Sequence, residues 1–296
     1  MLKVLPRLAA ICGVTALMGC ASATPLPGPP EDGTLRLATY NVHYIWLDRE
    51  EGNWSVGDWE RRKGPLDEAF KALQADVVAF QEMESFSFSD NTTNLTLDWL
   101  LANNPEHRAA AVGDPAVFPS TQPMLYRPDT LSVLDQGWFF FSDTPDVIYS
   151  RTFNGSFPAY ATWVEFEERA SGKSFTVVNV HYEFSSGSNR VKSAELVNAR
   201  TAERRAAGER VVLTGDLNAL SFFKTVRLHE EAGFTFLPVR GATYHLNRGI
   251  NLFGAIDHIA LHGNVSAAGE PVVLRRKFSG EWPTDHYPVF ADLVLD

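Results

Sequence analysis

The sequence predicts an α/β fold in which two packed β-sheets carry helices on their outer faces. Short apolar runs rich in β-branched and aromatic residues recur along nearly the whole chain, and each is typical of a strand. The segments between them include some that interleave polar and apolar residues at roughly helical spacing. About 260 residues follow the amino-terminal segment, a length that suits one large β-sandwich domain.

The elements follow one another in a simple order along the chain. Strands are predicted over Leu35–Tyr40, Asp76–Phe80, Gln122–Tyr126, Ala161–Phe166, Ser174–His181, Arg210–Leu213, Ile256–Leu261, Pro271–Arg276 and Pro288–Val294. Surface helices are predicted over Trp59–Leu73, Thr92–Leu101 and Asn189–Ala207. Ala161–Glu168 and Ser174–His181 flank a connection of hairpin length, Ala170-Ser171-Gly172-Lys173, so an antiparallel pair is expected there.

The amino terminus predicts an export signal. Lys3 and Arg7 precede an uncharged stretch, Leu8–Leu17, that is too short to span a bilayer as a mature helix, and small Gly19 precedes Cys20. This pattern is similar to a bacterial lipoprotein signal, which implies removal of residues 1–19, a lipid on Cys20, and a periplasmic or cell-surface protein anchored to the outer membrane. Residues 20–33, which include the Pro-rich Thr24–Pro30, are expected to be a tether to a domain over residues 34–296.

Cysteine content and charge restrict the chemistry of the mature chain. Its two cysteines, Cys12 and Cys20, would be removed and acylated, which leaves no thiol for a disulfide. The net charge of −10 becomes −12 without residues 1–19, because 24 basic residues then face 36 acidic ones. A non-specific nucleic-acid binder usually carries a basic face. The acidity weighs against a nuclease, although bound metal can reverse the sign locally.

Six polar clusters stand at the ends of predicted strands. They are Thr39-Tyr40-Asn41, Phe80-Gln81-Glu82, Asn179-Val180-His181, Gly215-Asp216-Leu217-Asn218, Ile256-Asp257-His258-Ile259 and Asp285-His286-Tyr287-Pro288-Val289. Each alone fits a structural role better than a functional one, and their number and order carry the inference. A carboxylate such as Glu82 suits Mg²⁺, which takes one or two protein carboxylates. An Asp–His pair across strands would orient and charge an imidazole for proton transfer.

This series of motifs resembles the endonuclease/exonuclease/phosphatase superfamily, whose fold is deoxyribonuclease-I-like, across nearly the whole mature domain. The resemblance implies a four-layer α-β-β-α sandwich with two mainly antiparallel sheets and the site at one edge. It also implies roles for particular residues. Glu82, Asn41 and Asp285 would hold Mg²⁺, or Mn²⁺ or Ca²⁺ in its place. Asp216 and Asn218 would orient the nucleophile and a phosphate oxygen. His286, paired with Asp257, would transfer protons, and His181 would bind or protonate the phosphate.

A magnesium-dependent phosphoesterase that uses in-line attack of activated water is therefore expected. Arg190, which opens a predicted helix, would add positive charge for an anionic substrate. Glu82 and His286 are expected to lie outside the core, so that their loss would leave a folded, nearly inactive protein. Replacement of Glu82 or His286 by alanine would then leave less than about a tenth of the activity.

The class of substrate stays open among nucleic acid, phospholipid or sphingolipid, and small phosphoesters. Trp138-Phe139-Phe140-Phe141 is either a membrane-contacting patch or a buried strand, with the strand favoured. Phe86, Phe88, Phe222 and Phe223 add apolar surface near the motifs, so a phospholipase-C-like or sphingomyelinase-like activity is the alternative to a nuclease. Tyr182-Glu183 and Met83-Glu84-Ser85, which follow two motifs, depart from the family pattern and are expected to bear on substrate. A non-catalytic binding lipoprotein is a less favoured alternative, and no protein partner is inferred.

Overall fold

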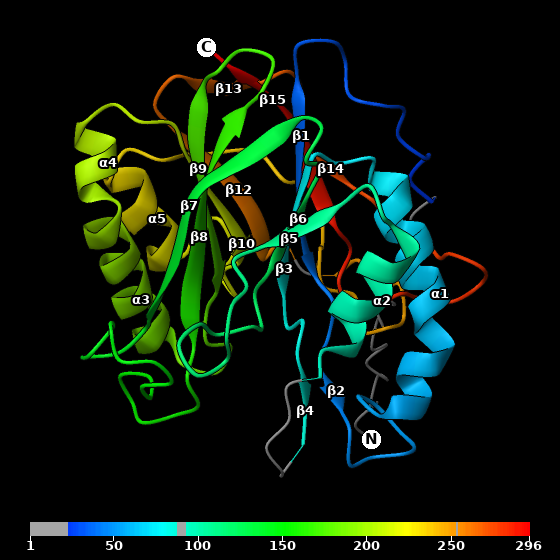
Figure 1. The fold of residues 1–296 in the computed structure, drawn as a ribbon. Helices are drawn as coiled ribbons and strands as arrows, with labels where there is room; N and C mark the ends of the chain where they lie inside the picture. The colour runs from blue at the N-terminus through cyan, green and yellow to red at the C-terminus, as the bar shows by residue number, and fades with distance from the viewer. Residues whose placement is uncertain (1–22, 88–92, 253) are drawn as a thin grey trace, which may run out of the picture.

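The computed structural model describes residues 23–87, 93–252 and 254–296, and Figure 1 shows its arrangement. The predicted signal segment 1–19 and the predicted lipidation residue Cys20 lie outside these described residues. Within the described ranges, no helix is both long and apolar enough to cross a membrane.

Two sheets face each other and form the centre of the molecule, with helices on both outer faces (Figure 1). The first sheet has the order β13 (Val265–Ala267), β15 (Val289–Leu295), β1 (Leu35–Asn41), β3 (Val77–Gln81), β6 (Met124–Tyr126) and β5 (Arg108–Ala110), with β14 (Val272–Val273) beside β15. The second has the order β11 (Thr235–Phe236), β12 (Asp257–His262), β10 (Val211–Asp216), β9 (Ser174–His181), β8 (Tyr160–Glu168) and β7 (Leu131–Phe140). A small third sheet pairs β2 (Ile45–Trp46) with β4 (Ser85–Phe86).

The helices divide between the two outer faces. α1 (Val56–Leu73) and α2 (Leu95–Asn103) cover the first sheet, whereas α3 (Gly187–Arg200), α4 (Ala202–Ala206) and α5 (Lys224–Glu231) lie on the side of the second sheet (Figure 1). The predicted four-layer α-β-β-α sandwich is therefore confirmed. Most strand pairs are antiparallel, including the predicted β8–β9 hairpin.

Burial on both faces explains why the central strands are apolar along their whole length. Every residue of β1 is buried: Leu37 packs in the core between the sheets, and Ala38 packs in the core under the helices. Val177 of β9 and Val212 of β10 fill the opposite side of the inter-sheet core. Each fully buried Val or Leu side chain contributes about 1.5–3 kcal/mol. The described residues contain no cysteine, so burial of this kind is what holds them together.

Several predicted elements differ from the structure in extent. The predicted helix Asn189–Ala207 is divided into α3 and α4 at Thr201, which is the C-cap of α3 and whose hydroxyl donates to Val197 O. The predicted strand Pro271–Arg276 is reduced to the two residues of β14. Only the aromatic end of β7 was predicted as a strand, and the short α5 was not predicted.

The Pro-rich segment lies against the domain from residue 24 onward. Thr24 bonds through its N–H to Arg275 O and through its hydroxyl to Val273 O, each at 2.9 Å. Gly28 O accepts a hydrogen bond of 2.7 Å from Arg36 Nη1. These bonds make residues 24–28 part of the folded surface, although this segment was predicted to belong to the tether.

The parallel pairs in each sheet define the edge at which the motifs meet. β1 pairs in parallel with β3, and β9 pairs in parallel with β10. Parallel neighbours end at the same edge of a sheet, and the carboxyl ends of all four strands lie at the lower edge of the sandwich in Figure 1.

A buried polar chain joins the second sheet to its outer helices near this edge. His229 of α5 is fully buried; its Nδ1 lies 2.6 Å from Asn198 Oδ1 on α3, and its Nε2 lies 2.9 Å from the hydroxyl of Tyr182, which follows β9. Burial above all, with the charges of Arg205 and His258, lowers the pKa of His229 to about 3. His229 is therefore neutral in the folded protein at neutral pH.

The free energy of unfolding is expected to decrease as the pH is lowered, because His229 is buried in its neutral form. Its pKa is lowered from 6.5 to about 3 on folding, so the unfolded chain binds more protons between these values, and acid favours unfolding. From pH 7 to pH 5 this group accounts for on the order of 2 kcal/mol of lost stability. Urea unfolding of the wild type and H229Q at both pH values measures it. An equal loss of stability in the two proteins would contradict the assignment.

Candidate active site

Eight polar side chains from separate segments meet at the lower edge of the sandwich. Asn41, His181 and Asp216 end β1, β9 and β10, and Glu82 directly follows β3. Contacts and charge interactions join the whole predicted set: Asn41, Glu82, His181, Asp216, Asn218, Asp257, Asp285 and His286. The sequence prediction that these residues share one site is thus matched by their placement.

Asn41 links the carboxylates of the two sheets. Its Nδ2 donates to Glu82 Oε1 at 3.0 Å and to Asp216 Oδ2 at 3.3 Å, while its Oδ1 accepts from His43 N at 3.2 Å. Asn41 therefore presents its nitrogen, and not its oxygen, to Glu82. In this orientation it braces Glu82, whereas the predicted role as a metal ligand needs the oxygen to face the ion.

Glu82 and Asp285 are two carboxylates that repel each other at the site. Burial, followed by the charge of Asp285, raises the pKa of Glu82 to about 7, although the Asn41 hydrogen bond opposes the rise. Burial would also raise the pKa of Asp285, but the charges of His286, His43 and His245 hold it below its usual value. Glu82 has a left-handed φ of 55°, a strained backbone conformation for a residue with a side chain.

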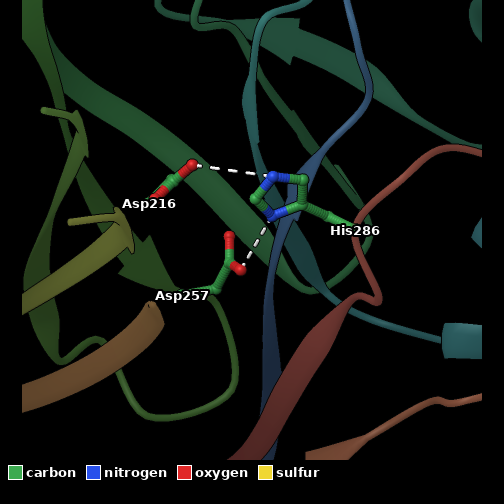
Figure 2. A group of neighbouring side chains, drawn as sticks. All are labelled: Asp216, Asp257 and His286. Atoms are coloured by element: carbon green, nitrogen blue, oxygen red, sulfur yellow. Dashed lines mark hydrogen bonds and ion pairs between the residues drawn. The ribbon is translucent and has the colours of Figure 1, made fainter. Parts of the chain in front are cut away.

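Asp257, His286 and Asp216 form a chain, which Figure 2 shows. His286 Nδ1 lies 2.9 Å from Asp257 Oδ2, and its Nε2 lies 3.8 Å from Asp216 Oδ2. Burial alone would lower the pKa of His286, but the charge and hydrogen bond of Asp257, with the charges of Asp216 and Asp285, raise it to about 10. Burial and the charge of Asp257 raise the pKa of Asp216 to about 6, despite His286 and His181.

His181 stands between the two sheets. Its Nε2 lies 3.6 Å from Glu82 Oε1 and 3.8 Å from Asp216 Oδ2. Burial lowers the pKa of His181 more than the charge of Asp216 raises it, so its neutral form is favoured. A neutral imidazole here can donate one hydrogen bond to a phosphate oxygen, as the predicted phosphate-binding role requires.

Asn218 reaches the site through a turn and not through an extended chain. Its φ of 46° reverses the backbone after β10, its N–H donates to Asp216 Oδ1 at 2.8 Å, and its Nδ2 donates to Tyr182 O at 2.8 Å. These two bonds fix the orientation of the Asn218 side-chain amide. Arg190, which was predicted to face an anionic substrate, donates hydrogen bonds through Nη1 to the carbonyl oxygens of Glu183 and Phe184. Its guanidinium therefore holds the loop after β9.

Two donor groups at the site suit a divalent cation. One oxygen or nitrogen each from Asp216, Asp257 and His286 lies within 4.8 Å of the others, a grouping that could hold a metal ion. Asp257 Oδ1 is also buried without a hydrogen-bond partner. The second group is Glu82 with Asp285, whose mutual repulsion a cation would relieve.

Two residues that brace the site were not predicted to matter. Gln81 Nε2 donates to Asn179 Oδ1 at 2.7 Å, and Asn179 Nδ2 donates to Phe80 O at 2.7 Å, so these fully buried amides tie β3 to β9 across the core. Both residues belong to the quoted motifs, and the available signal was an amide inside an otherwise apolar strand. A buried amide of this kind must be paired, which makes it a specific link between the sheets.

Burial corrects two predictions about exposed residues. His286 is only 6% exposed and was expected outside the core, so its replacement by alanine would also disturb packing. Phe139, Phe140 and Phe141 are buried, so the membrane-patch alternative for this aromatic run is wrong. Phe222 and Phe223 are exposed near the site, Phe86 is half-buried, and Phe88 lies outside the described residues.

The protein is thus an α-β-β-α sandwich whose two facing sheets carry carboxylates, amides and an Asp–His pair along one edge. The chain belongs to the endonuclease/exonuclease/phosphatase family, whose model matches residues 38–286. The matched range contains all eight residues that meet at the edge. Members of this family are hydrolases that act on phosphate esters, typically with a divalent metal.

Solved structures share this fold. A family member from Bacteroides thetaiotaomicron superposes with a TM-score of 0.74 at 22% identity, over 91% of this chain and 100% of that one. A mannosyl-6-phosphatase from Bacteroides thetaiotaomicron VPI-5482 gives a TM-score of 0.71 at 22% identity, over 88% of this chain and 99% of that one. At these identities the likeness is one of fold.

A sequence relative comes from Acanthamoeba polyphaga mimivirus. Its uncharacterized protein L388 is 27% identical over 168 residues, which are 55% of this chain and 60% of the viral protein. This chain therefore spans about three-fifths of the length of that relative.

Proposed function

We propose that this protein hydrolyses phosphate esters with Mg²⁺ as its cofactor, by in-line attack of water on phosphorus. The observation that carries the proposal is the Asp257–His286 hydrogen bond of 2.9 Å, with Asp216 facing the second ring nitrogen at 3.8 Å. This arrangement places a charged imidazole and a carboxylate with a raised pKa side by side, beside the strained Glu82.

Glu82, with Asp285, would hold the metal ion. Both supply the oxygen donors that Mg²⁺ prefers, and both face His286 and the other acids of the site. The ion, when bound, would offset negative charge that gathers on the non-bridging phosphate oxygens. The Asp216–Asp257–His286 grouping suits Mg²⁺ less, because His286 is a nitrogen donor and already binds Asp257.

His286 and Asp216 would handle the protons. A pKa of about 10 makes His286 a cation at neutral pH, with Asp257 fixing its Nδ1–H so that Nε2–H faces the reacting group. It would stabilise the transferring phosphoryl group and protonate the leaving oxygen. Asp216, with a pKa near 6, is suited to accept the proton of the attacking water.

A lipid phosphodiesterase is a second candidate for the substrate class. The loops after β9 and β10, which start side by side, expose Phe184 at 78% and Phe222 at 61%. Exposed aromatic side chains near a catalytic edge favour an apolar substrate or surface. The net charge of −10 disfavours an extended nucleic-acid substrate, which binds mainly through its phosphates.

Export and anchoring are proposed from the first residues of the sequence. Lys3, the apolar stretch and Gly19-Cys20 support cleavage before Cys20 and attachment of lipid. Radiolabelled fatty acid should enter the wild-type protein during expression in a Gram-negative host and should not enter C20S. Label in both variants, or in neither, would overturn the proposal.

Metal removal is expected to abolish activity, because the charge of the phosphoryl group would lose its counterion. The domain from residue 23 onward is assayed after EDTA treatment and after return of Mg²⁺, Mn²⁺ or Ca²⁺. The panel holds a hexose 6-phosphate, bis-p-nitrophenyl phosphate, sphingomyelin, phosphatidylcholine, RNA and plasmid DNA. If the protein hydrolyses none of these phosphate esters with any of these ions, the proposal is refuted. If hydrolysis continues in EDTA, the proposed dependence on a metal is refuted.

A further inference from the structure

The side chain of Tyr182 makes its contacts toward the outer helices, and not toward the eight polar residues of the site. This residue departs from the family pattern, and the sequence suggested that it bears on substrate choice. Its side chain is instead fully buried, packs edge-on against Phe141 at 5.2 Å between ring centroids, and reaches His229. The buried side chain of Tyr182 makes no direct contact with substrate, so its identity needs another explanation.

The direction of the hydrogen bonds around His229 follows from its neighbours. Asn198 Nδ2 donates to Leu228 O at 2.9 Å, which turns Asn198 Oδ1 toward His229. An oxygen of this kind only accepts, so His229 Nδ1 carries the proton. The lowered pKa of His229 makes its ring neutral, so its Nε2 accepts and the Tyr182 hydroxyl donates.

The backbone of Tyr182 holds both sides of the turn after β10. Its N–H donates to Asp216 O at 2.9 Å, and its C=O accepts from Asn218 Nδ2 at 2.8 Å. The preceding residue is His181, which faces Glu82 and Asp216. One anchored residue thus fixes the position of a catalytic loop and the orientation of the Asn218 amide.

We propose that Tyr182, His229 and Asn198 are positioning residues for the active site, which hold His181, Asp216 and Asn218 in register from the outer helices α3 and α5. The inference rests on the proposed hydrolysis for its kinetic consequence. In the described structure none of the three side chains bonds to Glu82, Asp285 or His286. Their link to the site is the backbone of Tyr182, which bonds to Asp216 and Asn218.

The Y182F variant tests the anchor, because it removes only the hydroxyl and keeps both backbone bonds. We expect kcat to fall about tenfold with KM changed less than twofold, since a misplacement of 1 Å can cost ~10²-fold. A purely structural role would lower the melting temperature and leave kcat unchanged. T176V is the matched control: it removes the buried hydroxyl on β9 that accepts a hydrogen bond of 3.3 Å from Arg204 Nη1 of α4, at the opposite end of the strand from His181.

Two substitutions of His229 separate its two hydrogen bonds. Gln can return an acceptor at the place of Nε2 for Tyr182, whereas Asn returns a donor at the place of Nδ1 for Asn198. We expect H229Q to keep most of the wild-type kcat and H229N to match Y182F. Equal kcat values for H229Q and H229N, or a loss in T176V equal to that in Y182F, would overturn the inference.

Hydrogen exchange provides a readout that does not depend on catalysis. The amides of residues 181–184 and 216–219 should exchange faster in Y182F than in the wild type and T176V. A wild type without phosphoesterase activity would refute the proposed function, and the exchange rates would still judge the positioning role. Unchanged exchange in Y182F would count against it.

Discussion

Replacement of His286 by asparagine is expected to lower kcat about 10²–10⁴-fold, the range for loss of an acid–base group. Asparagine is chosen because His286 is buried against Asp257, and an alanine would leave that carboxylate without its hydrogen bond. The amide of asparagine can still donate to Asp257 Oδ2 from about the place of Nδ1. The group lost is Nε2, which lies toward Asp216.

A pH series checks that the loss comes from this charge. The pKa of His286 rises from 6.5 to about 10 on folding, so its stabilising effect is complete below pH 6.5 and disappears as pH rises through 10. H286N should therefore lose less stability than the wild type between pH 7 and pH 10 in urea unfolding. Activity in H286N within tenfold of the wild type would remove His286 from the mechanism.

A buried histidine far from the site provides the control for this substitution. His107 packs on Phe70 at 4.8 Å between ring centroids, in the layer of α1. H107N should lower stability and leave kcat within about twofold, since surface and core changes outside a site act on folding. A loss of kcat in H107N as large as in H286N would show that both act through folding.

The fold followed from local pattern where strands are buried on both faces. β1, β3, β9 and β10 are continuous apolar runs, and the ends of each were located to within three residues. β7 was harder to recognise because its middle is exposed: Asp135 lies beside a bulge in the pairing with β8. α5 was not predicted because its first turn lacks an acidic residue and its N-cap residue, Phe223, makes no side-chain hydrogen bond to the helix.

The site followed from order along the chain, whereas its geometry depended on tertiary contacts. That Asn41 turns its nitrogen toward Glu82 results from the amide of His43, which takes Oδ1. The Tyr182–His229 bond joins residues 47 positions apart, and no local signal marks either partner. Pairings of this kind arise only when α5 docks on the second sheet.

Replacement of Glu82 by glutamine is expected to lower kcat by about 10³-fold or more. A bound metal supplies several kcal/mol of charge stabilisation to the transition state, and about 1.4 kcal/mol is a factor of ten. Glutamine has the shape of Glu82 and can keep the hydrogen bond from Asn41, but it presents no negative charge to an ion. Mg²⁺ should therefore raise the melting temperature of the wild type and not that of E82Q.

The metal-free proteins should show the opposite order of stability. Folding raises the pKa of Glu82 from 4.5 to about 7, so at pH 8 its ionised carboxylate costs stability in the absence of metal. E82Q removes that charge and the repulsion from Asp285, so at pH 8 with EDTA it should melt at the same temperature as the wild type or above it. Asp76, at the other end of the same strand, supplies the control, because D76N alters a buried carboxylate whose Oδ2 accepts from Arg36 N. D76N should keep its activity and its rise in melting temperature with Mg²⁺. If E82Q still turns over substrate and is still stabilised by Mg²⁺, the metal is bound by Asp216, Asp257 and His286 instead.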